Sequence, residues 1–237
     1  MDQSFSERSF WKTLRKGDVQ KYNLGKTRAE IRNSLRSIEE EANKENFAFK
    51  PFNVQTRNRS KVFTTNNSTD EFILRKISDN LKRSLNIHPA DLNDIIPQII
   101  TLAREARDCS IHKFDISSFF ESIDRSTLMS SLIREEKISP RTTCLISTLF
   151  QSNQFINITG LPRGLSISPI LAEYYLRGLD SSCRRLECCY FYTRYVDDML
   201  FFCHGNTSSL TKYIKNNLPI GLKINPNKTT SIQIDNK

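Results

Sequence analysis

The sequence has 237 residues, 38% of them hydrophobic, which is enough to form the core of one large domain or of two smaller lobes. Its formal net charge of +9 at pH 7 favours a polyanionic partner, although a well-solvated basic surface has the same composition. No apolar run approaches the length that crosses a bilayer, and no signal-peptide core lies near Met1. We therefore expect a cytoplasmic protein that does not enter a membrane.

Helices and strands alternate along the chain, which predicts an α+β fold around a sheet. The first helix is expected at 27–46, where Ile31, Leu35 and Ile38 form one stripe, and the polar stretch 47–69 predicts a loop or a short hairpin. Further helices are predicted at 70–85, 89–107, 125–136, 140–151, after Pro169 and near 207–217. Strands are predicted at 111–116, in a hairpin over 190–202, and as a pair at the end of the chain.

The positive charge is concentrated at the start of the chain, because residues 1–90 contain 18 Lys and Arg against 11 Asp and Glu. The six cysteines (109, 144, 183, 188, 189 and 203) have neither a disulfide framework nor the usual zinc spacing. Reduced thiols in a cytosolic protein are therefore the better interpretation.

Two adjacent acids, Asp197 and Asp198, lie in an otherwise apolar and aromatic stretch. The flanking segments 190–192 and 199–202 are typical of β-strands, which places the acids in a hairpin. Neighbouring carboxylates repel each other and resist desolvation, so they are tolerable beside a cation or on an open turn. The pair therefore predicts a metal site with a third ligand elsewhere. A solvated hairpin tip or a Ca²⁺ site is the alternative.

A third acid, Asp115, ends the predicted strand that begins at Ile111. Strand alternation places Ile111, Lys113 and Asp115 on one face. If this strand lies beside the hairpin, three carboxylates converge on one spot. Carboxylate, carbonyl and water oxygens suit Mg²⁺, and two such ions can hold the attacking and leaving oxygens of a phosphoryl transfer.

Between these acids lies a glycine-containing segment, residues 160–169, with the sequence Gly-Leu-Pro-Arg-Gly-Leu-Ser-Ile-Ser-Pro. Its glycines permit close approach of the backbone to a ligand. Ser168 followed by Pro169 predicts the start of a helix, with a capping hydroxyl and a proline at the first helical position.

In order and spacing, these segments resemble the palm and fingers of reverse transcriptases. Asp115 matches the first carboxylate motif, 160–169 the loop and helix that contact template and nucleotide, 195–198 the (Y/F)xDD box, and 221–229 a later motif that ends in a lysine. The resemblance extends from about Glu71 to Lys228. The phrases Asp-x-x-x-Phe-Phe-Glu-Ser-Ile and Leu-Pro-Arg-Gly-Leu-Ser look most like those of bacterial defence-associated, abortive-infection-type reverse transcriptases.

The resemblance implies a right-hand polymerase fold with an antiparallel palm sheet backed by helices. It divides the chain into an N-terminal basic helical region (1–69), fingers (70–110 and 125–165) and palm (111–124 and 166–237). The family usually continues into a primer grip and a helical thumb, whereas this sequence stops nine residues after Lys228. We therefore expect either a fragment or a thumb function that a partner or the RNA fulfils.

The resemblance also implies roles for individual residues. Asp115 and Asp197 would bind Mg²⁺, or Mn²⁺, with Asp198 nearby and the backbone carbonyl of Ile116 as an additional ligand. Phe120 would lie under the incoming sugar and select deoxynucleotides, unless it belongs to the core. The other implied substrate contacts are Arg163, where many relatives have glutamine, Gly164, Arg75 and Lys76 for the triphosphate, and Lys228 for the departing pyrophosphate. Alternatively, each of these cations is a solvent-exposed residue that does not contact the substrate.

The function that the resemblance implies is an RNA-directed DNA polymerase that uses dNTPs and an RNA template, makes DNA, and acts in antiphage defence with a noncoding RNA. One alternative is a polymerase that works without a template or primes from a protein hydroxyl. Another is an RNA-binding, polymerase-like subunit of low activity, associated with a partner polymerase or with a second copy of itself.

Overall fold

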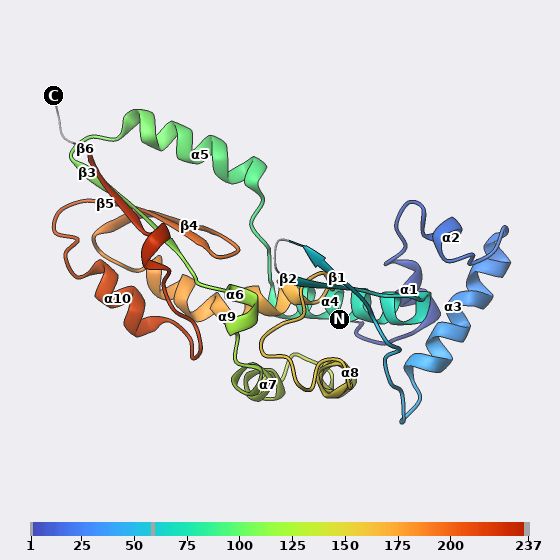
Figure 1. The fold of residues 1–237 in the computed structure, drawn as a ribbon. Coiled ribbons are helices and arrows are strands. Elements are labelled where there is room, and N and C mark those ends of the chain that lie inside the picture. The colour runs from blue at the N-terminus through green and yellow to red at the C-terminus, as the bar shows by residue number, and fades with distance from the viewer. Residues whose placement is uncertain (1, 58–59, 235–237) are drawn as a thin grey trace. The chain divides into compact units, whose positions relative to one another are not determined.

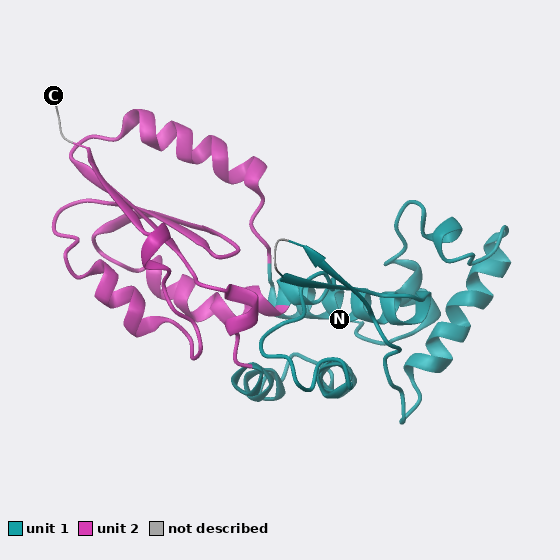
Figure 2. Ribbon diagram, viewed as in Figure 1, with its two compact units in different colours: residues 1–87, 125–170 teal, residues 88–124, 171–237 magenta. Residues whose placement is uncertain are grey.

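The computed structural model describes residues 2–57 and 60–234 as a mixture of helices and antiparallel sheet (Figure 1). The chain forms two compact units (Figure 2). Unit 1 comprises residues 1–87 and 125–170, and unit 2 comprises residues 88–124 and 171–237. The predicted α+β class is confirmed. Within the described ranges, no helix combines the length and the apolar character that crossing a bilayer requires.

Unit 1 is built around one buried helix, α4, and a two-stranded hairpin. Its elements, in chain order, are α1 (Glu7–Trp11), α2 (Asp18–Lys21), α3 (Arg28–Ala42), β1 (Asn53–Arg57), β2 (Ser60–Thr64), α4 (Ser68–Leu85), α7 (Arg125–Ile133) and α8 (Pro140–Gln151). Helices α1, α3 and α8 contact α4. Its apolar residues Phe72, Ile73, Leu74, Ile77 and Leu81 are fully buried, so α4 forms the centre of this core.

Polar caps set the ends of the long helices in unit 1. Thr27 and Glu30 form a capping box at the start of α3, in which each side chain accepts a backbone N–H of the other residue. The side chain of Asn67 accepts the backbone N–H of Asp70 at the start of α4. Asn86 ends that helix in the left-handed conformation, with φ 53°. These boundaries lie close to those that the sequence predicts.

A buried ion pair joins the N-terminal region to α4. The Arg75 guanidinium donates to both Asp18 oxygens, at 2.5 and 3.1 Å, and to Glu71 at 2.7 Å. Only 6% of the Arg75 side chain and 5% of the Asp18 side chain are exposed. This ion pair and the contacts of α1 and α3 with α4 make the N-terminal basic helical region part of unit 1.

Unit 2 contains a four-stranded antiparallel sheet with the strand order β4-β5-β3-β6. Its elements are α5 (Leu92–Glu105), β3 (Cys109–Asp115), α6 (Phe119–Ser122), β4 (Cys189–Tyr195), β5 (Asp198–Cys203), α10 (Leu210–Asn217), the 3-10 helix η1 (Pro226–Lys228), β6 (Thr230–Ile234) and all but the first residues of α9 (Ser168–Cys183). The predicted hairpin is therefore present as β4 and β5, and β3 pairs directly with β5.

The two faces of this sheet have different neighbours. On one face, Arg194 of β4 donates to Asp180 of α9. On the other face, Lys113, Thr193 and Leu200 line a cavity of about 250 Å³ together with the apolar side of α5. Figure 1 shows α5 and α9 on opposite sides of the sheet. The sheet is therefore covered by a helix on each side.

Two parts of unit 2 can be compared with the sequence predictions. Residues 88–110 belong to unit 2, because α5 lies against its sheet, and their assignment to the fingers stays a prediction. The predicted final strand pair is reduced, within the described residues, to β6 and an isolated bridge between Ile116 and Ile224. The intervening Pro226 favours the 3-10 turn η1 over a continuous strand.

The buried pair of Arg75 and Asp18 gives a stability prediction. We expect Asp18→Ala to lower the free energy of unfolding by about 3–5 kcal/mol, because it leaves a buried guanidinium without this partner. Urea denaturation followed by circular dichroism measures the change. Glu41→Ala, which removes the exposed ion pair with Lys44, is the control and should cost less than about 1 kcal/mol. Equal losses in the two variants would contradict the structural role.

Candidate active site

The turn between β4 and β5 holds the two adjacent acids. Its residue Val196 has φ 56°, a left-handed conformation that is unfavourable for a β-branched side chain. The Arg194 guanidinium donates to the backbone oxygen of Val196 at 2.8 Å. This hydrogen bond holds the strained turn from within the sheet.

Arg194 is itself fixed by two carboxylates of α9. Its guanidinium donates to Asp180 at 2.7 and 2.9 Å and to Glu173 at 2.6 and 3.1 Å, and 4% of its side chain is exposed. Burial disfavours the charged guanidinium and so lowers its pKa, but the hydrogen bonds to Asp180 and Glu173 outweigh this effect and raise the pKa of Arg194 overall. The Tyr192 hydroxyl also donates to Asp180, at 2.6 Å. These four residues connect the acidic turn to α9.

None of the motifs found in the sequence includes this network. The sequence pattern that could have indicated it is the spacing of its residues: Glu173 and Asp180 are seven residues apart on one face of a helix, and Tyr192 and Arg194 are two residues apart on one face of a strand. Such a pattern predicts that acids and an arginine face each other only when the helix is known to cover that strand.

Strand pairing brings the predicted carboxylates together. Asp115 lies opposite Asp198 in the register of β3 and β5, and the Ile116 N–H donates to the backbone oxygen of Asp197 at 3.1 Å. Burial, followed by the nearby carboxylates of Asp115 and Asp198, raises the pKa of Asp197. Negative charge is therefore concentrated around Asp197.

Two lysines lie against these acids. The ammonium group of Lys228 is 3.0 Å from one oxygen of Asp115, and the Asn225 amide donates to the other oxygen at 3.0 Å. The hydrogen bond with Asp115 raises the pKa of Lys228. The ammonium group of Lys113 is 2.9 Å from an oxygen of Asp198. Lys228 therefore contacts a motif residue, as its position in the fourth motif suggests, whereas the sequence analysis assigns no role to Lys113 or Asn225.

The acids do not form a closed three-ligand cage. Among the described residues, no group of three His, Cys, Asp or Glu side chains is placed to hold a metal ion. The expected convergence of three carboxylates is thus incomplete, because Asp115 and Asp198 each turn toward a lysine. Asp115 and Asp197 nevertheless fit Mg²⁺. It needs only one or two protein carboxylates, and it would relieve the repulsion that raises the pKa of Asp197.

The glycine-containing loop packs against the hairpin of unit 1. The Phe63 N–H donates to the Arg163 oxygen at 2.7 Å, and Val62 and Arg163 form a parallel bridge. Gly164 has φ 94°, and a Cβ at this position would lie 2.5 Å from the Phe63 oxygen. Gly164 is therefore required by this backbone contact. Its predicted approach to substrate remains a prediction, as does the role of Arg163.

The start of α9 lies at the predicted position. The helix begins at Ser168, and the Ser168 hydroxyl also donates to the Pro162 oxygen at 2.5 Å. The loop is also held by Arg125, whose guanidinium donates to the backbone oxygens of Gly160 and Phe155. Hydrogen bonds from both ends thus fix the loop conformation.

The two phenylalanines after Asp115 have different environments. Phe119 is 1% exposed and belongs to the core, whereas Phe120 is half-buried, with its ring centroid 5.4 Å from that of Phe119. The core role that the sequence leaves open for either residue therefore belongs to Phe119. Phe120 stays the predicted sugar-contacting residue.

Arg75 and Lys76 are buried, with 7% and 3% exposure. Arg75 is engaged by Asp18 and Glu71, and the Lys76 ammonium group donates to the Asp2 backbone oxygen at 3.1 Å. A triphosphate could reach either cation only if these contacts broke. The structure therefore favours a stabilising role for both, and we do not include them in the proposed site.

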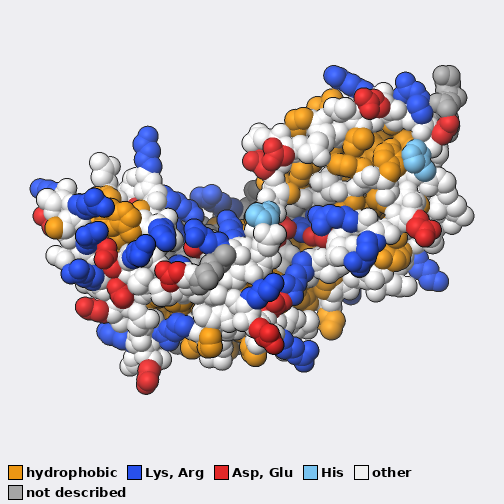
Figure 3. Space-filling model, turned by 180° about the vertical axis from the view of Figure 1, so that it is seen from behind, with side chains coloured by type: hydrophobic (Ala, Val, Ile, Leu, Met, Phe, Trp, Pro, Cys, Tyr) orange, Lys and Arg blue, Asp and Glu red, His pale blue; other side chains and the backbone are white. Residues whose placement is uncertain are grey.

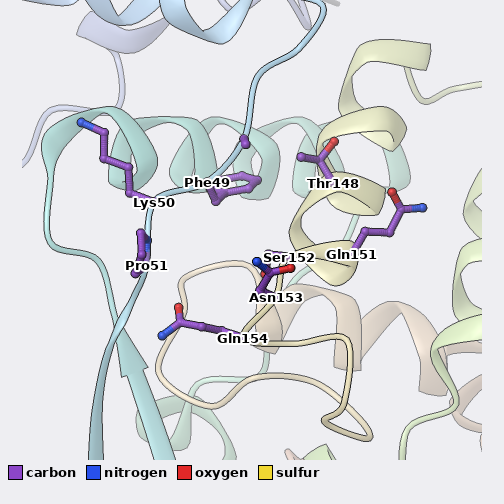
Figure 4. A pocket seen from close by; sticks show the side chains of 9 residues that line it. Phe49, Lys50, Pro51, Thr148, Gln151, Ser152, Asn153 and Gln154 are labelled. Atoms are coloured by element: carbon purple, nitrogen blue, oxygen red, sulfur yellow. The ribbon is translucent and has the colours of Figure 1, made fainter.

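Unit 1 also contains a larger hollow of about 430 Å³, shown in Figure 4. Its lining residues are Ala48, Phe49, Lys50, Pro51, Thr148, Gln151, Ser152, Asn153 and Gln154. The Gln154 amide donates to the Phe52 oxygen at 3.0 Å and accepts the Phe52 N–H at 2.5 Å. This lining contains no carboxylate, histidine or cysteine, and Lys50 is its one charged side chain.

A four-stranded antiparallel sheet covered by helices is the fold of a polymerase palm. Residues 26–235 match the family model described as reverse transcriptase (RNA-dependent DNA polymerase). Because this match covers most of the sequence, the chain belongs to the reverse transcriptase family. No curated protein matches the sequence.

Similar solved structures support the same fold. Telomerase from Candida tropicalis, truncated from its C-terminal domain, is 14% identical, with 80% of this chain and 51% of that chain covered and a TM-score of 0.54. Telomerase from the same organism, in complex with a TWJ fragment of telomeric RNA, is 13% identical, with 78% and 41% covered and a TM-score of 0.53. The chain thus spans about half the length of these telomerase chains.

The buried arginine behind the turn gives a second stability prediction. Arg194→Leu leaves Asp180 and Glu173 without their common cation, and we expect a loss of about 3–5 kcal/mol in the free energy of unfolding. Chemical denaturation measures it. Arg185→Leu, a change at an exposed arginine just after α9, is the matched control and should change stability by less than about 1 kcal/mol. An unchanged midpoint for Arg194→Leu would show that the network does not stabilise the sheet.

Proposed function

We propose that this chain catalyses RNA-directed DNA synthesis, in which nucleotides from dNTPs are added to a primer 3′-hydroxyl on an RNA template. One observation carries the proposal: the turn with Asp197 and Asp198 is paired in register with the strand that ends at Asp115, in a chain of the reverse transcriptase family. This pairing brings Asp115 opposite Asp198, which supports the proposal that these acids serve phosphoryl transfer.

Asp115 and Asp197 are the proposed ligands of Mg²⁺ or Mn²⁺, with the Ile116 carbonyl as an additional candidate. When bound, such ions activate the attacking hydroxyl and neutralise the charge that develops on the phosphates. Asp198, paired with Lys113, adjusts the charge of the turn without closing a cage. Lys228 lies beside Asp115 as a protonated ammonium group, and we propose it as the proton donor to the departing pyrophosphate.

The loop around Arg163 is the proposed contact to template and incoming nucleotide. Its backbone is fixed by Phe63, Gly164 allows close approach, and the Arg163 fork is suited to phosphates or to stacking on a base. Phe120 is the proposed sugar-selecting residue.

We place the activity in antiphage defence, in the bacterial cytoplasm and with a noncoding RNA as template. The sequences Asp-Ile-Ser-Ser-Phe-Phe-Glu-Ser-Ile at 115–123 and Leu-Pro-Arg-Gly-Leu-Ser at 161–166 support this subfamily. Synthesis without a template and priming from a protein hydroxyl are alternative modes of the same chemistry.

A second candidate function is an RNA-binding, polymerase-like subunit of low activity that works with a partner polymerase or a second copy of itself. The observation that favours it is the pairing of Asp115 with Lys228 and of Asp198 with Lys113, since a lysine on an acid competes with a metal ion.

An incorporation assay tests the proposal. The purified protein, with the RNA that copurifies with it, is incubated with labelled dNTPs and Mg²⁺. We expect Asp197→Ala/Asp198→Ala to lower incorporation about 1,000-fold or more, because metal-assisted charge stabilisation contributes several kcal/mol to such reactions. Sequencing the product identifies template and primer.

The control for this assay is Glu40→Ala/Glu45→Ala, which removes two exposed carboxylates of unit 1 and should leave incorporation unchanged. If the wild-type protein binds RNA but incorporates nothing with Mg²⁺ or Mn²⁺ and any primer, the low-activity subunit is the correct function.

The different burial of the two phenylalanines predicts separate effects. Phe120→Ala should admit ribonucleotides, seen as a ratio of rNTP to dNTP incorporation raised at least about tenfold, which corresponds to about 1.4 kcal/mol of discrimination. Phe119→Ala should instead destabilise the fold by about 3–5 kcal/mol, because it leaves a core cavity. An unchanged ratio in a folded Phe120→Ala protein rules out the sugar-selecting role.

A further inference from the structure

The only tryptophan of the sequence lies in a cationic pocket of unit 1. We call it the Trp11 pocket. It has a volume of about 400 Å³ and is lined by Glu7, Arg8, Trp11, Lys12, Arg28 and Arg32. Its size is within the range of sites that hold small molecules or parts of larger ones, roughly 300–1,000 Å³.

Helices α1 and α3 form the pocket and keep Trp11 at the surface. Ser9 and Phe10 of α1 are buried, and Phe10 packs on Phe72 of α4 with ring centroids 6.4 Å apart. The next residue, Trp11, is only half-buried. An indole that is held by a rigid helix but left out of the core offers its ring to a ligand.

Cations surround this ring. The guanidinium carbon of Arg28 is 5.4 Å from the Trp11 ring centroid and that of Arg32 is 6.0 Å from it, while Arg8 and Lys12 are exposed. The one acid of the lining, Glu7, lies 3.4 Å from Arg32. Positive charge therefore exceeds negative charge in the pocket. Figure 3 shows Lys and Arg side chains gathered on the face of unit 1 turned toward the viewer.

We propose that the Trp11 pocket binds single-stranded nucleic acid, with one base stacked on the indole ring and flanking phosphates on the surrounding cations. Stacking platforms combined with basic grooves bind single strands, since every base has a π-face and every linkage a charge. An acidic peptide would use the cations but not the ring. A duplex keeps its bases stacked inside and would leave the ring unused.

This site is distinct from the proposed polymerase centre. Its α1 residues precede the part of the chain that matches the family, and none of its lining residues belongs to the motifs around Asp115, Arg163 or Asp197. The inference rests on the proposed function only for the expectation that single-stranded RNA or DNA is present. The pocket would hold such a strand independently of catalysis.

Because the chain has one tryptophan, tryptophan emission excited at a wavelength that its seven tyrosines do not absorb reports on this pocket alone. The full chain is titrated with oligouridylate and with oligothymidylate of about ten nucleotides, the length scale of single-strand sites. We expect saturable quenching of the emission of Trp11. The two oligonucleotides distinguish RNA from DNA as the bound strand.

Variants test the contacts separately, with binding measured by the anisotropy of a labelled oligonucleotide. Trp11→Leu should weaken binding about 5- to 150-fold, the range for loss of one base–aromatic stack, and Trp11→Phe should restore most of it. Arg28→Ala/Arg32→Ala should lower the slope of log affinity against log salt by about 1.4, for two phosphate contacts on a single strand. Because this variant keeps Trp11, it also retains the fluorescence signal.

Lys212→Ala/Lys215→Ala, which removes two exposed charges from α10, is the matched control and should alter neither affinity nor quenching. The inference is overturned if no oligonucleotide quenches the emission of Trp11. It is also overturned if a duplex or polyglutamate quenches it as strongly as the single strands do.

Repeating the titration with Asp197→Ala/Asp198→Ala separates the two proposals. Quenching that persists in this variant supports the pocket regardless of catalysis. Incorporation by the wild-type protein without any quenching would refute the pocket and leave the proposed function intact.

Discussion

The candidate active site depends on the hydrogen bonds of one buried arginine. The charged Arg194 side chain can be buried because it donates hydrogen bonds to two carboxylates of α9. A further N–H of the same guanidinium donates to the backbone oxygen of Val196. A left-handed valine at a tight turn is unfavourable by itself. The hydrogen bond from the buried arginine therefore maintains the geometry of the turn, which does not depend on contacts between the acids.

The same arrangement keeps the acids close enough to repel one another. Asp115 and Asp198 each have a lysine nearby, while the neighbouring carboxylates and burial raise the pKa of Asp197. Such a site holds its carboxylates close together at a cost that a divalent cation relieves. Lys113 and Lys228 supply part of the neutralising charge, at 2.9 Å from Asp198 and 3.0 Å from Asp115.

Local patterns in the sequence predicted the long helices and the hairpin of β4 and β5, because caps, periodicity and alternation are properties of neighbouring residues. Contacts between distant segments could not be predicted in this way. The burial of Arg75 depends on Asp18, 57 residues away, and the role of Arg194 depends on which helix covers β4. The acids stand out by their apolar surroundings, and the family resemblance suggested their role together with a triphosphate role for Arg75, a cation that the fold uses internally.

The backbone contact between Phe63 and Arg163 has a consequence for how this loop can evolve. The hairpin holds position 163 through its carbonyl oxygen, which every amino acid has, while Gly164 is fixed by the lack of room for a side chain. The backbone link to the hairpin therefore does not depend on which side chain stands at 163. A substitution there changes the chemistry that the loop presents and leaves this link in place, whereas any side chain at 164 would collide with the hairpin.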